Sequence, residues 1–330
     1  MVGLSHARRC PQFAGTAWGP PWEDIPCPYA NTPCVEYGIT LPSAGPLAAP
    51  DALMAVATLA EAVGYASLWV TDHIAIPEQS TSPYPYRPDR KPPWPPTIPY
   101  LDAFTTLTWV GAVTRRVRLG TSVLILPLRP PLIVAKTVAT LDSLTGGRMI
   151  LGVGAGWLKE EFDLLGQSFE DRGPRMKEAI RILKACWGPD PVSFQGRFYR
   201  LPPFGLDPKP AQGARLPVLG GGESDVALRR VAEACDGWHP LNLLPEQIAE
   251  RLGRLREWTA RAGRSMSDLF LTARPGVSHP LTPDLAAQYE ALGIRLLVAD
   301  LDYRRLTLPE ALAQVAQLAR TLHLPGAPVV

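Results

Sequence analysis

Short apolar runs alternate with amphipathic helical stripes along this chain, and this alternation limits its possible folds more than any other feature. Apolar residues recur at helical spacing after each run, as Leu53, Val56 and Ala60 do after the first. The expected strands are 35–41, 66–71, 117–126, 148–153, 216–219, 237–239, 269–272 and 294–299. The expected helices are 50–63, 101–114, 132–144, 174–187, one that begins after Ser224, 245–262, 283–292 and 308–322.

Eight strand–helix units in strict order predict an α/β fold of the (β/α)8 barrel type. The 330 residues are enough for such a barrel with additional segments. A doubly wound sheet is the alternative, but it usually has about six strands and a phosphate loop after the first one. Here the glycine-rich turns follow the fourth and fifth strands. We therefore expect one barrel over residues 35–330, preceded by an N-terminal extension over residues 1–34.

Proline is unevenly distributed, and 18 of the 37 prolines lie within residues 1–50 and 77–100. Proline lacks a backbone N–H and fixes φ, so these segments are not expected to form regular helix or central strand. Segment 77–100 follows the second strand and is expected to roof a site at the barrel mouth. A hairpin and loop over 190–215 and the loops after the seventh and eighth strands are expected to contribute to the same lid. The aromatic residues of the first segment are Tyr84, Tyr86, Trp94 and Tyr100.

The charge balance indicates neither a nucleic acid nor an anionic membrane as a partner. There are 33 basic and 31 acidic side chains, a formal net charge of +2. No window of about eighteen apolar residues is free of charge and proline, and the first residues lack the apolar stretch of a secretory signal. We therefore expect a cytoplasmic protein, without a membrane or nucleic-acid partner, that acts on a small molecule.

The cysteines give no reason to expect a metal. Cys186 and Cys235 lie on the apolar stripes of expected helices, where thiols are usually buried. The cysteines near the N-terminus, even together with His6, match no zinc-binding spacing. These are Cys10, Cys27 and Cys34.

The second expected strand ends in Thr71-Asp72-His73. Active sites of (β/α)8 barrels lie where the strands end, so this is a candidate for chemistry. An Asp–His pair can hold an imidazole in one tautomer for proton transfer. The alternative is a helix-capping Asp beside an exposed His. We take His73 and Asp72 as the candidate catalytic residues.

Two glycine-rich turns follow adjacent strands of the expected barrel. Spaced glycines let backbone amides point at an anion, and the N-terminus of a helix adds to the attraction. The two turns could hold one phosphate together, although glycine is also what any tight turn needs. The first turn is Gly152-Val153-Gly154-Ala155-Gly156-Trp157, and the second is Gly220-Gly221-Gly222, with Ser224 opening the next helix.

Other positions near strand ends have two interpretations each. Small residues at Thr121, Ser122 and Val123 could let a planar ligand approach the third strand, or they are ordinary strand packing. Trp157 is either a wall of a ligand pocket or a loop anchor. A group of acidic residues after it is expected to occupy the first turn of a short helix rather than to take part in catalysis. This group is Glu160, Glu161 and Asp163.

Several of these motifs resemble the bacterial luciferase-like family, and in particular its branch of coenzyme F420-dependent oxidoreductases. The resemblance extends from about residue 37 to residue 238 and fades in the last third of the chain. It is carried by residues 67–73 (SLWVTDH), 120–123 (GTSV), 141–148 (LDSLTGGR), 151–157 (LGVGAGW), 160–162 (EEF), 171–173 (DRG), 220–222 (GGG) and 236–238 (DGW).

The resemblance implies a barrel that binds a flavin or a deazaflavin at the carboxyl ends of its strands. A cis peptide bond between Ser122 and Val123 would lie behind the ring, and Asp72 would lie beside it. In sugar-phosphate dehydrogenase relatives the histidine that matches His73 is an acid/base, and a glutamate stands where this chain has Trp157. That departure argues against sugar-phosphate dehydrogenation and leaves the proton donor open. The implied phosphate contacts are Ala155, Gly156, Gly221 and Gly222.

The resemblance favours an F420-dependent oxidoreductase that transfers a hydride between the deazaflavin and a small organic substrate. The alternatives are an FMN-dependent monooxygenase that uses oxygen and a barrel that binds a cofactor without turnover. Members of the family are often dimers, so the resemblance allows a homodimer. The expected cofactor contacts are Asp72, Thr121, Ser122, Val123, Gly154, Ala155, Gly156, Trp157, Gly220, Gly221, Gly222 and Ser224.

Overall fold

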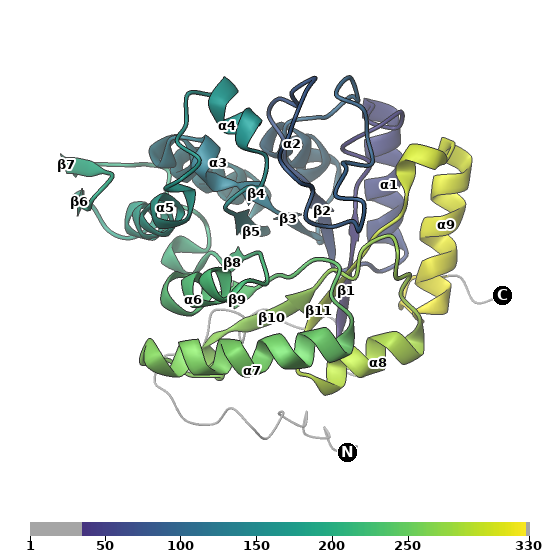
Figure 1. Cartoon of the computed structure of the whole chain (residues 1–330). Helices are drawn as coiled ribbons and strands as arrows, with labels where there is room; N and C mark the ends of the chain where they lie inside the picture. The colour runs from purple at the N-terminus through teal and green to yellow at the C-terminus, as the bar shows by residue number, and fades with distance from the viewer. Residues whose placement is uncertain (1–34, 328–330) are drawn as a thin grey trace, which may run out of the picture.

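The computed structural model describes residues 35–327. The expected N-terminal extension, with His6 and its three neighbouring cysteines, lies outside the described residues. Figure 1 shows helices arranged around a central sheet. Among residues 35–327, no helix combines the length and apolar character that a bilayer crossing requires. In the same range, no cluster of three or more His, Cys, Asp or Glu side chains is placed to hold a metal ion.

The central sheet is a closed parallel barrel, which confirms the predicted fold class. The strands run in the order β3-β2-β1-β11-β10-β9-β8-β5-β4, and a further β3–β5 pairing closes the ring. All of these pairings are parallel, and nearly every strand residue is buried, as expected for strands covered by helices outside and packed side chains inside. The strands are β1 (Glu36–Thr40), β2 (Ser67–Val70), β3 (Arg118–Thr121), β4 (Leu124–Ile125), β5 (Met149–Gly154), β8 (Val218–Gly220), β9 (Gly237–Trp238), β10 (Phe270–Ala273) and β11 (Leu296–Ala299).

The third strand position is broken, where the sequence predicted one continuous strand over 117–126. β3 ends at Thr121 and β4 begins at Leu124, with a cis peptide bond between Ser122 and Val123. The Val123 side chain packs against the next strand at a position where only glycine fits. A Cβ on Gly154 would lie 2.6 Å from Val123 Cγ2. The break therefore turns Val123 onto the backbone of β5, and the glycines of β5 make room for it.

The helices follow the predicted positions, because their apolar stripes pack onto the barrel. Ser224 caps its helix by accepting a hydrogen bond from the Ala227 N–H, as expected. Cys186 and Cys235 are buried on helix faces, also as expected. The helices are α1 (Pro50–Ala62), α2 (Ala103–Val113), α3 (Pro131–Thr145), α4 (Lys159–Leu164), α5 (Arg172–Trp187), α6 (Asp225–Ala234), α7 (Pro245–Arg261), α8 (Pro283–Ala291) and α9 (Leu308–Thr321).

Two of the segments predicted to form a lid lie at different places. Residues 77–99 form an irregular loop after β2, at the carboxyl ends of the strands, as predicted. The hairpin of β6 (Val192–Gln195) and β7 (Arg200–Phe204) projects from the side of the molecule beside α5 (Figure 1). The segment after it reaches the amino end of β5, where the Gln212 side chain donates to the Met149 carbonyl. The prediction that 190–215 covers the site is therefore wrong, because this segment connects a helix to the start of the next strand.

Candidate functional site

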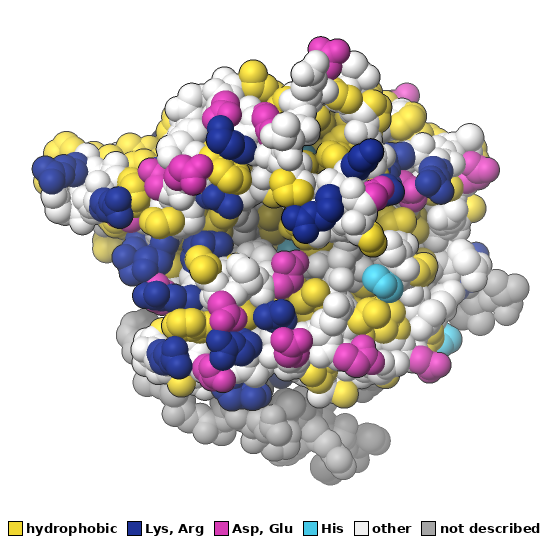
Figure 2. All heavy atoms as spheres, viewed as in Figure 1, with side chains coloured by type: hydrophobic (Ala, Val, Ile, Leu, Met, Phe, Trp, Pro, Cys, Tyr) yellow, Lys and Arg dark blue, Asp and Glu magenta, His cyan; other side chains and the backbone are white. Residues whose placement is uncertain are grey.

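A cleft opens at the carboxyl ends of the strands, between the 77–99 loop and the start of α7. It has a volume of about 470 Å³ and is lined on one side by Tyr86 and on the other by Glu223, Asn242 and Arg251, among others. Figure 2 shows this face of the molecule hollowed between the loop and the helix. The predicted site residues lie around this end of the barrel.

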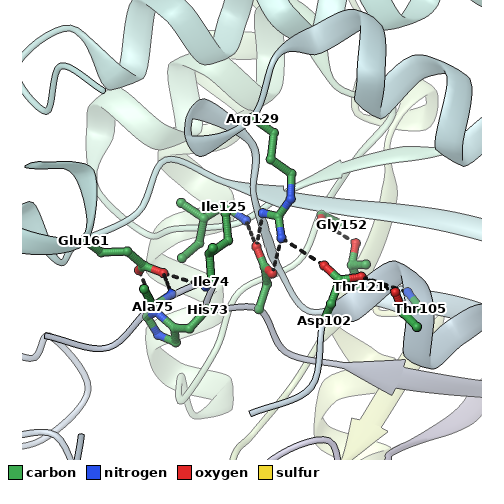
Figure 3. Close-up of polar contacts among 11 residues, drawn as sticks. His73, Ile74, Ala75, Asp102, Thr105, Thr121, Ile125, Arg129, Gly152 and Glu161 are labelled. Atoms are coloured by element: carbon green, nitrogen blue, oxygen red, sulfur yellow. Dashed lines mark hydrogen bonds and ion pairs between the residues drawn. The ribbon is translucent and has the colours of Figure 1, made fainter. Parts of the chain in front are cut away.

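His73 lies at the end of β2 and is paired with Glu161 from α4. Its Nδ1 is 2.8 Å from Oε2 of Glu161, and Oε1 of the same carboxylate accepts hydrogen bonds from the Ile74 and Ala75 N–H groups. Glu161 is fully buried, and His73 is 8% exposed. Figure 3 shows the carboxylate of Glu161 turned toward these three residues. The carboxylate thus fixes both the imidazole ring and the chain that leaves β2.

The prediction that the acidic residues occupy the first turn of a short helix is confirmed for Glu160 and Glu161, and the structure adds what their side chains bind. Both side chains hold the loop after β2. Glu160 accepts hydrogen bonds from Thr81 and Ser82. Burial opposes ionisation of Glu160, but these hydrogen bonds outweigh it and lower the pKa to about 2. The pattern of acidic residues was visible in the sequence, but the loop that they bind was not.

The ring of His73 faces an aromatic enclosure. Tyr100 and Trp157 meet it edge-on, with ring centroids 5.4 and 6.1 Å away, and the Trp94 ring lies 6.2 Å away. Tyr84 packs on both Trp94 and Trp157. Within the described residues, Nε2 of His73 has no hydrogen-bond partner, so it is available to a ligand. Trp157 contacts both the ring of His73 and Tyr84 of the loop, so its two predicted roles, pocket wall and loop anchor, both stay predictions.

Asp72, the other predicted catalytic residue, does not contact the imidazole of His73. Its carboxylate accepts hydrogen bonds from Nη1 and Nη2 of Arg129 at 2.7 and 2.8 Å and from the Ile125 N–H at 2.9 Å. Its side chain is fully buried. Figure 3 shows Arg129 reaching down beside Ile125 and toward Asp102. Asp72 thus ties the end of β2 to the end of β4, and the partner of His73 is Glu161.

A second polar network crosses the mouth behind the strand break, and the sequence reasoning missed it. Nε2 of His239 is 2.7 Å from the Ser122 hydroxyl, and its Nδ1 is 2.6 Å from the Thr272 hydroxyl. The Thr272 hydroxyl donates its proton to the Trp238 carbonyl, so it accepts from Nδ1–H of His239. Nε2 then accepts from the Ser122 hydroxyl. Burial lowers the pKa of His239 to about 3, which keeps this ring neutral.

Arg274 completes this network from the end of β10. Its Nη1 donates to the Ser122 carbonyl at 2.8 Å and to the Ser122 hydroxyl at 3.1 Å. Its Nε and Nη2 make a bidentate pair with Asp300, which follows β11. Asp300 directly follows a predicted strand and Arg274 lies two positions beyond the end of another, so the rule that sites lie where strands end points to both residues, though not to their contacts.

The two glycine turns do lie side by side, but their residues have different roles. A Cβ on Gly221 would lie 3.1 Å from Val123, so this turn and Gly154 both face the strand break. The Gly221 N–H donates to the Val153 carbonyl. Gly220 faces α6, where a Cβ would meet Val231 and Cys235. Gly220 therefore serves packing, and the Gly221 amide is engaged in the barrel wall.

Other predicted contacts divide in the same way. Thr121 is fully buried and donates its hydroxyl proton to the Gly152 carbonyl, so it belongs to the barrel wall. Gly156 and Gly222 have φ of 84° and 97°, which favour glycine. Within the described residues, the N–H groups of Ala155, Gly156 and Gly222 donate no hydrogen bond. Free amides beside a glycine-lined break fit the phosphate and the planar ring of a flavin-type cofactor.

The extent of one match to known proteins decides the family. The profile described as luciferase-like monooxygenase covers residues 34–314. The chain belongs to the luciferase-like monooxygenase family. This confirms the resemblance that the motifs carried, and extends it over the last third of the chain.

Similar proteins of this luciferase-like family include F420-dependent enzymes. An uncharacterised protein of Mycobacterium tuberculosis is 39% identical over 210 residues, which cover 64% of this chain and 72% of that protein. The F420-dependent glucose-6-phosphate dehydrogenase of Kineococcus radiotolerans is 31% identical over 249 residues, which cover 73% of this chain and 67% of that enzyme.

Two solved structures show the same luciferase-like fold. The monooxygenase RslO1 from Streptomyces bottropensis superposes with a TM-score of 0.69 at 18% identity, covering 88% of this chain and 99% of that one. The coenzyme F420-dependent tetrahydromethanopterin reductase from Methanopyrus kandleri gives 0.67 at 17% identity, covering 88% and 99%. One neighbour is a monooxygenase and the other a reductase, so the fold alone does not select the cofactor.

Proposed function

We propose that this luciferase-like protein is an F420-dependent oxidoreductase that transfers a hydride between the deazaflavin and a small, mostly apolar organic substrate. The observation that carries the proposal is the His73–Glu161 pair: the carboxylate binds Nδ1, Nε2 has no partner among the described residues, and the ring lies against the aromatic enclosure at the barrel mouth. Transfer of a hydride to or from a carbonyl or alcohol carbon needs a partner for the oxygen's proton. The F420-dependent relatives support the choice of cofactor.

The cofactor, when bound, supplies the two-electron hydride chemistry, and the protein supplies position and electrostatics. Ser122 and Val123 are the residues that would lie behind its ring, and the free amides of Ala155, Gly156 and Gly222 would receive its phosphate. In the ring of His73, the Glu161 carboxylate can only accept, so Nδ1 carries the proton in the neutral form. Nε2 of His73 is then the atom that takes a proton from a substrate hydroxyl, or returns it to a carbonyl oxygen.

The aromatic enclosure favours an apolar substrate. Tyr84, Trp94, Tyr100 and Trp157 surround the imidazole with apolar ring surface and leave the His73 side chain only 8% exposed. The Tyr100 hydroxyl is engaged with Thr71, and burial raises its pKa well above the usual value. Tyr100 is therefore a wall rather than the proton donor. Trp157 contributes further apolar area where sugar-phosphate dehydrogenase relatives have a glutamate.

An FMN-dependent monooxygenase is the second candidate, and the description of the matching family as luciferase-like monooxygenase supports it. The test is a fluorescence-quenching titration of the purified protein with F420 and with FMN, followed by oxygen uptake and by F420 absorbance with small alcohols and ketones. We expect F420 to bind at least about tenfold more tightly than FMN and to be turned over without oxygen uptake. Tight FMN binding with oxygen uptake would overturn the proposal, and binding of neither would favour a barrel without turnover.

A further inference from the structure

Two arginines are buried among residues 35–327, and they differ in whether their guanidinium groups have hydrogen-bond partners. Arg148 is 8% exposed and Arg230 is 9% exposed. Arg148 donates hydrogen bonds to Gly111, Thr114, Thr145 and Val117. Arg230 has no hydrogen bond or ion pair with any described residue. The nitrogens of Arg230 are not among the unpartnered side-chain atoms that are sealed from solvent, so the unpaired guanidinium of this largely buried side chain remains accessible to a ligand.

The guanidinium of Arg230 lies at the N-terminus of a neighbouring helix. Arg230 belongs to α6, and its Nη1 would lie 3.1 Å from a Cβ built on Gly173, in the first turn of α5. The adjacent Arg172 donates from Nε to the Gly156 carbonyl, in the turn after β5. Arg230 therefore reaches from the helix that follows one glycine turn toward the other glycine turn. Basic side chains also gather over α5 and α6 in Figure 2.

The charges around Arg230 leave it in need of an anion. Burial lowers its pKa, a weak attraction to the Cys235 thiol opposes this, and the positive charge of Arg172 adds to the lowering. Glu170 acts on Arg172 and not on Arg230. The N-terminus of the sixteen-residue helix α5 adds further positive potential. Two cationic groups and a helix N-terminus beside free backbone amides are the recognised composition of a phosphate site.

We propose that Arg230 binds the phosphate of the cofactor between the two glycine turns, and that this contact selects the phosphorylated cofactor over its unphosphorylated core. The inference rests on the proposed function for the identity of the cofactor, but the phosphate is common to F420 and FMN. Arg172 stays bound to the Gly156 carbonyl and to Phe169, and it positions the first turn of α5. Arg230 supplies the fork of free N–H donors.

The first experiment measures binding by fluorescence quenching with two pairs of probes. These are F420 against its deazariboflavin core without the phosphate tail, and FMN against riboflavin. In the wild-type protein we expect the phosphorylated member of a pair to bind more tightly. Arg230→Met should weaken its binding about 10- to 100-fold and leave the unphosphorylated core unchanged. Arg229→Met is the matched control, because that neighbour is exposed and paired with Glu233.

The second experiment uses inorganic phosphate alone, and thus does not depend on the cofactor. Removing an unpaired charge that lies beside Arg172 and a helix N-terminus should leave the melting temperature of the ligand-free Arg230→Met protein unchanged or raised, whereas loss of a structural contact would lower it. Millimolar phosphate should stabilise the wild type and the Arg229→Met protein, but not Arg230→Met. If the wild type binds neither F420 nor FMN while this phosphate effect remains, the proposed function fails and the phosphate site stands. If F420 binds but Arg230→Met keeps its affinity and its preference for the phosphorylated form, the role of Arg230 is refuted and the proposed function stands.

Discussion

The mouth of the barrel carries one histidine on each side, and the two differ in what their imidazoles can do. His73 follows β2 and His239 follows β9, which stand opposite each other in the ring of strands. Among the described residues His73 is bound on one nitrogen only, by a carboxylate, and its ring lies against the aromatic enclosure. His239 is bound on both nitrogens by hydroxyl groups and is stacked on Trp69 with ring centroids 4.8 Å apart.

This difference shows that the surroundings, and not the residue type, decide the role. The carboxylate of Glu161 is a charged acceptor on Nδ1 of His73 and leaves Nε2 without a partner among the described residues. Hydroxyl partners in a buried site do not compensate a positive charge, and Arg274 beside the network opposes one further. His73 is therefore suited to proton exchange, and His239 is suited to holding Ser122 at the strand break.

The largest effect that tests the comparison is expected from His73→Asn. If Nε2 exchanges the substrate proton, turnover with F420 should fall about 10²- to 10⁴-fold, while the dissociation constant of the cofactor stays within about twofold. Stopped-flow and quenching measurements separate the two quantities. His323→Asn is the control, because His323 is exposed and its φ of 54° suits asparagine. Unchanged turnover in His73→Asn would remove the distinction between the two histidines.

The dependence of stability on pH should test whether His239 is held neutral in the folded protein. The folded-state pKa of His239 is about 3, below the usual 6.5, so between these values the unfolded chain binds a proton that the folded chain does not. Stability is therefore complete above pH 6.5 and falls as the pH drops, by about 1.4 kcal/mol per pH unit from this group. Urea unfolding of His239→Gln between about pH 6.5 and 4.5 should show a shallower slope than the wild type. An equal slope would mean that His239 is not held neutral.

Glu161→Gln should lower turnover, if His73 exchanges the substrate proton, without altering the affinity for the cofactor. An amide can bond Nδ1 but does not stabilise the imidazolium, so we expect turnover to fall about 10- to 100-fold with cofactor affinity unchanged. Glu160→Gln is the matched control, since Glu160 is the adjacent residue of α4 and holds the loop at Thr81 and Ser82. Equal losses of turnover in both variants would reduce Glu161 to a loop anchor.

The smallest effect concerns the hydroxyl that fixes the tautomer of His239. Thr272→Val leaves the buried Nδ1–H without an acceptor, which should lower the free energy of unfolding by about 1–2 kcal/mol. Thr259→Val is the control, because the hydroxyl of that equally buried threonine donates only to a carbonyl of its own helix. Chemical denaturation of both variants measures the difference. If the two lose equal stability, the His239 network contributes nothing specific.

The sequence predicted the barrel well because each strand–helix unit carries its own pattern. The buried strands, the Ser224 cap and the glycines at the strand break all follow from local spacing or from recognisable motifs. The pairing of His73 with Glu161 does not follow from any local spacing or motif, because Glu161 lies 88 residues further along the chain. Asp72, the adjacent carboxylate, was the natural choice from the sequence, but Arg129 binds it.

The network around His239 shows the same limit more strongly. Ser122 and His239 are 117 residues apart, and Ser122 and Arg274 are 152 apart. These contacts form only because the ring of strands closes, so no local sequence pattern predicts them. Of the predicted phosphate contacts, Gly221 has its amide engaged by the Val153 carbonyl, a detail set by strand register. The register of a parallel barrel depends on all of its strands together.

The loop after β2 is fastened firmly at both of its stems. Glu160 holds Thr81 and Ser82, and at the other end the Leu101 N–H donates to Ser43 while the Gly45 N–H donates to Pro99. Between these stems, residues 83–98 are largely exposed and contain no helix or strand. The sequence of such a segment can therefore diverge, or be replaced by design, without disturbing the strands and helices of the barrel. Because Trp94 of this segment lies against the ring of His73 and Tyr84 packs on Trp94, replacing about sixteen residues would change the walls around this histidine while the strands stay in place.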